Sequence, residues 1–309
     1  MFQVEQHLNC IQQNLVEVCK YFNVEFYYIF FDSWKFNYNK SNVFAKSLLM
    51  PDKSEGSLCE LTDIKARHYD YLNDDLSKAI DLVQDQGKKS KIMIMLDSYF
   101  CPWHRGYKVL HIPHWCLVKQ YLAHEKFFTC EDPFYKVKDC QISFSELQKG
   151  LNSLILYTME KGTTKNRKEI DIFKDYIKKL DIEVMTSDMY DFANRILEIE
   201  NVEEFFDYKQ DVYLCSIFRA LKFTADMRYN LSYLFDKFCE LQKDIFYKKV
   251  ADVFEKCGEK FDNINCGIIK LFYSCNNFKE VKEGIHKSLL EIILHEKQAY
   301  EILYDYWFE

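Results

Sequence analysis

The chain has 309 residues, 48% of them hydrophobic and 17% aromatic, a composition that excludes a disordered protein and predicts a full hydrophobic core in one large or two modest domains. A formal net charge of -7 gives no basic footprint for nucleic acid. No apolar run reaches the roughly 18 residues of a membrane helix, and the first residues lack the layout of a signal peptide, so we expect a soluble, cytoplasmic protein without membrane partners.

The first predicted element is a helix that begins near Cys10. Asn9 is a good N-cap, and the apolar stripe of this helix consists of Ile11, Leu15, Val18 and Phe22. The 12 cysteines are dispersed and should be reduced and mostly buried, as we expect for Cys19. Cys10 differs in position, because a first-turn cysteine meets free amides and the positive end of the helix dipole. It is either a nucleophile or a small buried side chain.

The next hundred residues carry weaker signals. Residues 26–31 fit either a short strand or a buried helix, and the polar residues 51–57 predict a loop. A helix is predicted over residues 63–86. The nearly continuous apolar run at 91–97 is typical of a central strand that is buried on both faces.

A histidine-rich loop over residues 98–113 leads into two predicted strands, 114–121 and 126–130, separated by a short polar break. Pairing these strands as a hairpin places His114 opposite or diagonal to Asp132, and directly opposed Cβ atoms lie about 4.5–5.5 Å apart. A carboxylate there would hold the imidazole in one tautomer. This is the base and orienting acid of a catalytic triad, for which Cys10 is the candidate nucleophile.

The remainder is predicted to be helical. Residues 144–162 carry an apolar stripe, and 163–168 resemble a linker. The clearest helix covers residues 228–257, and the last, 281–306, ends in an aromatic patch that is expected to pack on the body rather than serve a partner. We therefore predict an α+β protein with a catalytic domain at 1–162 and a helical domain at 163–309.

A cysteine at a helix start, then a histidine at a strand start, then an acid at the end of the next strand is the order of papain-like cysteine enzymes. More specifically, the sequence resembles the BtrH-like family, whose namesake is the acyltransferase of butirosin biosynthesis. The residues that carry this resemblance are Asn9-Cys10, Asp97-x-Tyr99-x-x-Pro102-Trp103, Tyr107, His111-x-x-His114 and Glu131-Asp132-Pro133.

The resemblance covers roughly residues 1–160 and implies a papain-like fold: an N-terminal helix on a small antiparallel sheet. It also implies Cys10 as nucleophile, His114 as base and Asp132 as orienting acid. Members occur in nonribosomal, thiotemplated antibiotic biosynthesis, and one that the chain resembles forms amide bonds in closthioamide assembly. The implied partners are an acyl or peptidyl carrier protein, which presents the acyl group on its phosphopantetheine, and an amine acceptor. No cofactor is expected to be bound.

One feature departs from the papain-like pattern. The glutamine that usually assists the oxyanion about six residues before the cysteine is replaced by Val4, and the nearest amides are Gln6 and Gln3. Gln6 is the tentative oxyanion donor. The helical half matches no motif of the family.

Several alternatives stay open. The same triad would serve a cysteine peptidase that cuts a leader peptide, and the chain could also be a non-catalytic helical binding protein. A zinc site could be composed of Cys101, His104, His111, His114 and Cys116, although their spacing matches no compact finger or zincin. His111 is expected to hydrogen-bond locally. Asp97 either lines the cleft or caps the following loop, and Asp132-Pro133 could be only a strand-ending turn.

Overall fold

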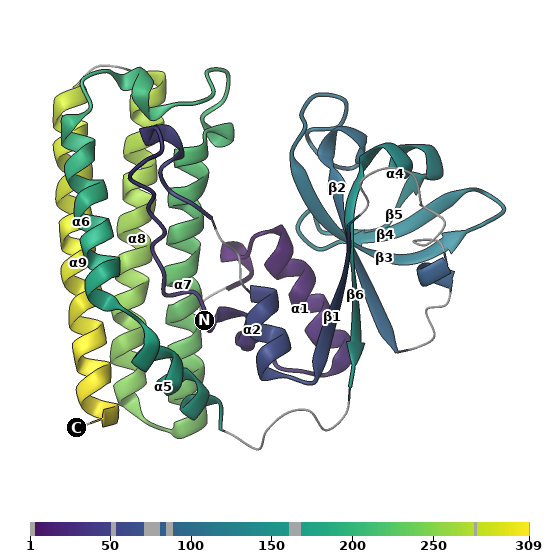
Figure 1. Cartoon of the computed structure of the whole chain (residues 1–309), viewed down its shortest axis with the longest axis horizontal. Helices are drawn as coiled ribbons and strands as arrows, with labels where there is room; N and C mark the ends of the chain where they lie inside the picture. Colours follow the sequence, from purple (N-terminus) through teal and green to yellow (C-terminus); the bar gives the residue numbers. More distant parts are fainter. Residues whose placement is uncertain are drawn as a thin grey trace. The chain divides into compact units, whose positions relative to one another are not determined.

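The computed structural model describes residues 4–50, 54–70, 81–84, 89–160, 168–274 and 277–308. The chain forms two compact units, each of which can be followed by its labels in Figure 1. The sheet unit comprises residues 8–29 and 54–166, and the helical unit comprises residues 1–7, 30–53 and 167–309. Residues 1–7 and 30–53 thus belong to the helical unit, whereas the sequence predicted a single domain boundary at residue 162. The physical reason is visible at Trp34, whose indole hydrogen-bonds to Glu296 in the interior of the helical unit.

The sheet unit is built on one antiparallel sheet with the order β1-β6-β2-β3-β4-β5. Its described strands are β1 (Ile64–Asp70), β2 (Ser90–Asp97), β3 (Pro113–Leu122), β4 (Phe127–Asp132), β5 (Val137–Ser143) and β6 (Leu151–Met159). Its helices are α1 (Cys10–Phe22), α2 (Ser54–Leu61) and α4 (Phe144–Gly150), with the 3-10 helix η4 (Ser98–Phe100). Helix α1 contacts β3 and β2. The predicted strands at 91–97, 114–121 and 126–130 are confirmed.

Three predictions in this unit were wrong. Residues 64–70 of the predicted 63–86 helix form strand β1 at the sheet edge, while 71–80 lie outside the described residues. The predicted helix over 144–162 ends at Gly150, after which the chain continues as β6 between β1 and β2. A strand covered on both faces shows a nearly continuous apolar run, and periodicity does not separate such a run from a buried helix. The loop predicted at 51–57 is helical from Ser54.

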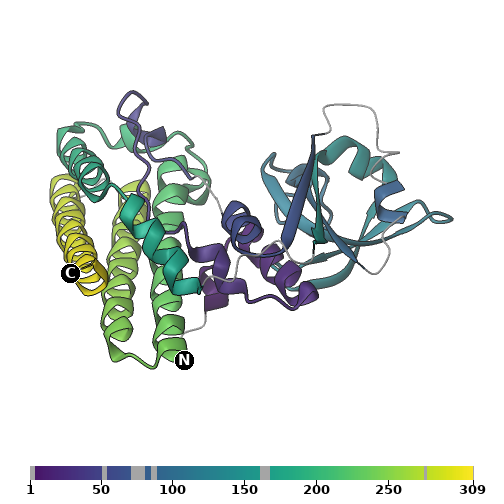
Figure 2. The same ribbon diagram turned by 60° about the horizontal axis from the view of Figure 1, so that its bottom comes forward.

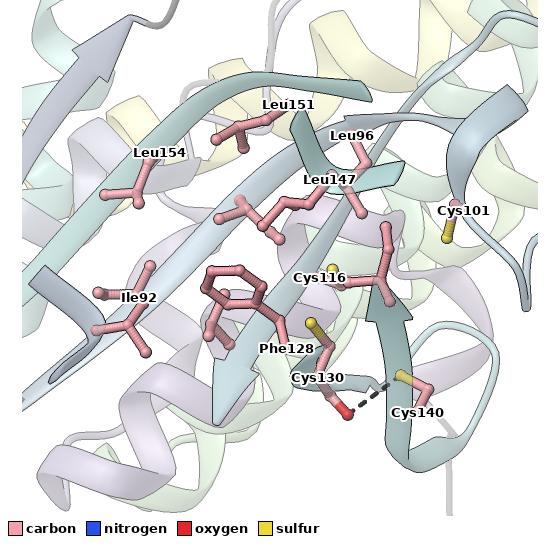
Figure 3. Packing of buried hydrophobic residues seen from close by; sticks show 14 residues of the cluster. Ile92, Leu96, Cys101, Cys116, Phe128, Cys130, Cys140, Leu147, Leu151 and Leu154 are labelled. Atoms are coloured by element: carbon pink, nitrogen blue, oxygen red, sulfur yellow. Dashed lines mark hydrogen bonds between the residues drawn. The ribbon is translucent and has the colours of Figure 1, made fainter. Parts of the chain in front are cut away.

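The core of the sheet unit is shown in Figure 3. Aliphatic side chains from β2, α4 and β6 meet Phe128 of β4 and a group of buried cysteines. The Cys140 thiol donates to the Cys130 carbonyl oxygen over 3.1 Å, and burial raises the pKa of the Cys140 thiol. The cysteines that the structure describes are all free thiols. Those of the core therefore act as small apolar side chains, as the composition predicts.

The helical unit contains five described α-helices: α5 (Glu169–Lys179), α6 (Ile182–Glu198), α7 (Ser216–Gln242), α8 (Ile245–Tyr273) and α9 (Phe278–Phe308). Its 3-10 helices are η1 (Val4–His7), η3 (Phe44–Lys46), η5 (Val202–Phe205) and η6 (Val212–Leu214), and η2 (Phe26–Phe30) leads into it. Helix α7 packs on α8, α8 on α9, and α9 on α6 (Figures 1 and 2). None of the helices of the described residues combines the length and apolar character of a membrane span.

The single helix predicted over 228–257 is wrong, because two helices meet there. Lys243 adopts a left-handed conformation with φ 55°, and the Asp244 side chain caps α8 by accepting from the Phe246 amide over 2.9 Å. Leu241 and Ile245, two apolar residues within the predicted helix, lie on either side of this turn and are 52% and 69% exposed. Close to this turn, Trp307 of the aromatic patch donates to the Tyr247 hydroxyl over 3.2 Å, so Trp307 packs on the body as predicted, whereas Tyr304 and Tyr306 are 39% and 49% exposed.

Candidate active site

The start of α1 is fixed by a capping box. The Asn9 side chain accepts from the Gln12 amide over 2.9 Å, and the Gln12 side chain accepts from the Asn9 amide over 3.2 Å. Cys10 is consequently the first residue of the helix and is half-buried. The N-cap predicted at Asn9 and the first-turn position of Cys10 are confirmed. The Gln12 amide is taken by this cap, whereas the Cys10 and Ile11 amides have no intrahelical carbonyl to bond and are disposed to bind a negative charge.

His114 lies at the beginning of β3, within the same unit. Its Nε2 is 2.6 Å from Oδ2 of Asp132, the last residue of β4. Leu117 pairs with Glu131, so the continued register sets Asp132 across from Cys116 and diagonal to His114, as the hairpin predicts. The Cys10 side chain is the other polar group that interacts with the imidazole and raises its pKa. Because Nε2 is taken by the carboxylate, Nδ1 is the nitrogen left for sulfur.

The protonation of His114 follows from these two partners. Burial, which is the largest influence, would lower its pKa, since the side chain is only 2% exposed. The hydrogen bonds to Asp132 and Cys10, together with their negative charge, outweigh burial and raise the pKa of His114 to about 9. At neutral pH the ring is therefore an imidazolium beside a buried carboxylate and a sulfur atom.

Asp132 is fully buried and hydrogen-bonded on both oxygens. Oδ2 also accepts from the Trp103 indole over 2.7 Å, and Oδ1 accepts from the Tyr135 amide over 3.2 Å. These bonds fix the plane of the carboxylate. Sequence reasoning quoted Trp103 within a motif but gave it no role. Its role depends on a contact across 29 residues, for which the local pattern holds no signal.

A second histidine adjoins His114. The rings of His104 and His114 lie 4.8 Å apart between centroids, and His104 Nδ1 accepts from the Gly106 amide over 2.8 Å. Burial, reinforced by the positive charge of His114, lowers the pKa of His104 to about 4. At neutral pH His104 is therefore neutral, and His114 is the positively charged ring of the two. Phe134 and Tyr135, which follow β4, complete an aromatic surround of His114.

The other predicted candidates lie apart from this arrangement. His111 is largely exposed and binds Asp97 at 2.6 Å, so its local hydrogen bonding is confirmed. Asp97 caps the loop by accepting from the Tyr99 amide over 2.9 Å, so its predicted capping is confirmed. Among the described residues, no group of three histidine, cysteine or acidic side chains is placed to hold a metal ion.

The oxyanion donor stays a prediction. Gln6 lies on η1, is exposed, and belongs to the helical unit. Gln3 lies outside the described residues. Within the sheet unit, the donors closest in sequence to the Cys10 sulfur are the first-turn amides of α1.

The chain was also compared with known proteins. No protein-family model matches it, and no curated protein matches its sequence. The chemistry is therefore inferred from the arrangement of Cys10, His114 and Asp132.

Proposed function

We propose that the chain is a papain-like cysteine acyltransferase that accepts an acyl group from a carrier-protein thioester and passes it to an amine. The observation that carries the proposal is the buried His114–Asp132 pair at 2.6 Å whose imidazole also meets the thiol at the start of α1. Nucleophile, base and orienting acid in this relation are the parts that covalent acyl transfer needs. The resemblance to the BtrH-like family adds the donor and acceptor classes.

The first half-reaction forms an acyl-enzyme. The Cys10 thiolate attacks the thioester carbonyl carbon, and the negative oxygen of the tetrahedral intermediate is stabilised by first-turn amides of α1. The carbon–sulfur bond to phosphopantetheine breaks as the His114 imidazolium donates its proton to the leaving sulfur. Cys10 then carries the acyl group as a thioester, and His114 is neutral. Exchange of one thioester for another is nearly balanced in free energy, so positioning is the main task of the protein.

The second half-reaction releases the amide. The amine attacks the acyl carbon, neutral His114 accepts the amine proton, and the bond to the Cys10 sulfur breaks. The thiolate and imidazolium are thereby restored. Burial of His114 and Asp132 under Trp103, His104 and Tyr135 supports transfer to an amine over hydrolysis, since it limits the access of water to the base.

The test is acyl-enzyme trapping by intact mass. The purified chain is incubated with a panel of acyl thioesters of N-acetylcysteamine, which mimic the phosphopantetheine arm, and then with amines. We expect one acyl adduct per chain, absent in Cys10→Ala and retained in Cys59→Ala. Cys59 is a matched control because it is also half-buried in the sheet unit, and burial raises the pKa of its thiol to about 11.

The fate of the adduct separates acyl transfer from its rivals. Amide formed faster than free acid supports the proposal, whereas free acid alone indicates a hydrolase and directs the test to leader peptides. An adduct that persists in Cys10→Ala, or no adduct with any thioester, overturns the assignment of Cys10.

A further inference from the structure

A buried amide joins the two elements that carry Cys10 and His114. Asn14 lies in α1, one turn after Cys10, and is completely buried. Its Nδ2 donates to the Cys10 carbonyl oxygen over 2.6 Å and to the Trp115 carbonyl oxygen over 3.0 Å. Trp115 follows His114 in β3. One side chain therefore ties the backbone of the candidate nucleophile to the backbone beside the candidate base.

The orientation of the Asn14 amide follows from its partners. Both are carbonyl oxygens, which only accept, so the NH₂ group must face them and Oδ1 must point elsewhere. Oδ1 is buried and has no hydrogen-bond partner among the described residues. A buried polar atom without a partner costs about 1–3 kcal/mol. An apolar side chain of similar size would avoid that cost, so stability alone is a poor reason for an amide here.

The bond to Trp115 is the informative one. A polar side chain that bonds the carbonyl four residues earlier is common in helices and has only local effects. The Trp115 carbonyl, by contrast, is 101 residues away and belongs to another element. A bond between elements fixes their relative height and rotation. That relation sets the separation of the Cys10 sulfur from His114 Nδ1, and a displacement of about 1 Å at such a site lowers rates about 100-fold.

We propose that Asn14 is a positioning residue that holds the thiol of Cys10 in line with His114 by bridging α1 and β3. This inference rests on the proposed function. It goes beyond the triad by assigning the relative placement of nucleophile and base to a residue that touches neither substrate nor reacting atoms.

Two substitutions separate the two hydrogen bonds. Asn14→Leu removes both and also removes the unpaired oxygen. Asn14→Thr keeps a hydroxyl that can bond the Cys10 carbonyl within the helix, but it is too short to reach Trp115 as well. Asn265→Leu is the matched control, because Asn265 is a buried helical amide of the helical unit whose side-chain nitrogen and oxygen have no partner among the described residues.

The readouts are the thermal unfolding midpoint and the rate of Cys10 alkylation by iodoacetamide from pH 5 to pH 10, with the modified site identified by peptide mass. We expect both Asn14 variants to fold. Their alkylation rate at pH 7 should fall about 10- to 100-fold. The upper inflection of the pH profile, which follows His114 at about pH 9 in the parent chain, should move toward the value near 6.5 of an ordinary histidine. Asn265→Leu should leave rate and profile unchanged.

Each outcome decides a separate question. A parent-like profile in Asn14→Thr overturns the role of the Trp115 bond, even if Asn14→Leu fails to fold. Equal losses in Asn14→Leu and Asn265→Leu reduce Asn14 to a packing residue. If the parent chain itself forms no acyl adduct but the profile still shifts in the Asn14 variants, the proposed function fails while the positioning role stands.

Discussion

Both units of the molecule bury charged side chains, and they complete the hydrogen bonding of those groups in different ways. In the helical unit, Arg228 and Glu296 are wholly buried and joined by two bonds of 2.7 and 2.9 Å. The remaining guanidinium nitrogen donates to the Lys35 carbonyl over 2.8 Å, and Trp34 donates to Glu296 over 3.1 Å. The side-chain nitrogens of Arg228 and the carboxylate oxygens of Glu296 thus all have partners within the protein.

In the sheet unit, the buried pair is His114 and Asp132, and the acid binds only one of the two imidazole nitrogens. The second imidazole nitrogen meets the half-buried thiol of Cys10 rather than a fixed structural partner. A histidine can exchange a proton near neutral pH, whereas an arginine cannot. Burial of charge alone therefore does not mark an active site. The proposed active site differs from the Arg228–Glu296 pair in having a buried titratable group beside a half-buried thiol.

The largest effect on stability is expected for the Arg228–Glu296 pair, whose polar atoms are all bonded within the protein. Glu296→Ala leaves the Arg228 charge buried without a partner and should lower the free energy of unfolding by about 3–5 kcal/mol. Urea unfolding followed by circular dichroism measures this loss. The control is Arg228→Met combined with Glu296→Leu, which should be less harmful than the single change because no charge remains. A loss below about 1 kcal/mol in Glu296→Ala would contradict a tightly coupled pair.

Substitution in the His114–Asp132 pair should chiefly change the rate of acyl-adduct formation. His114→Gln removes the base and should slow formation of the acyl adduct about 10²- to 10⁴-fold while the chain still folds. Stopped incubations analysed by intact mass give the rate. His111→Gln is the matched control, because His111 is a largely exposed histidine on the loop that leads into β3 and is bonded to Asp97. Aggregation of His114→Gln, or an equal effect in His111→Gln, would assign His114 to packing.

The pH dependence of stability should distinguish the two pairs. The pKa of His114 is raised to about 9 in the folded chain, against about 6.5 when unfolded. The folded state therefore holds the proton more tightly, and this stabilisation, about 3 kcal/mol, is fully present below pH 6.5 and lost as the pH rises through 9. Urea titrations at pH 6.5 and pH 9.5 should show the loss in the parent chain and not in His114→Gln. A loss of equal size in that variant would mean that other groups cause it.

The smallest effects test the tryptophans that serve each pair. Trp103→Phe and Trp34→Phe each remove one indole donor from a buried carboxylate, Asp132 and Glu296 respectively, and each should cost about 1–3 kcal/mol of unfolding free energy. Only Trp103→Phe should also slow acyl-adduct formation, since Asp132 orients His114. Unfolding titrations and adduct rates on the same samples make the comparison. Equal adduct rates in the two variants would remove Trp103 from the site.

Much of the site was readable from local sequence. The cap at Asn9, the helix start at Cys10 and the hairpin that pairs His114 diagonally with Asp132 each depend on residues within one helical turn or one turn between strands. Short-range hydrogen bonding and the two-residue repeat of strands fix such features before the rest of the chain is placed. The same reasoning failed for residues 64–70 and for β6, because pairing partners far along the chain made strands of segments whose apolar pattern resembled a helix.

By itself the sequence determined an α+β protein, the capped helix at Cys10 and the hairpin of His114 and Asp132. Only the tertiary structure decided that Trp103 and Tyr135 hold Asp132, that His104 lies beside His114, that Asn14 links α1 to β3, and that residues 30–53 group with the helices. The physical reason is range. Capping and strand pairing across a short turn are set by neighbours in the chain, whereas the protonation of a buried histidine depends on every group that folding brings within hydrogen-bonding distance.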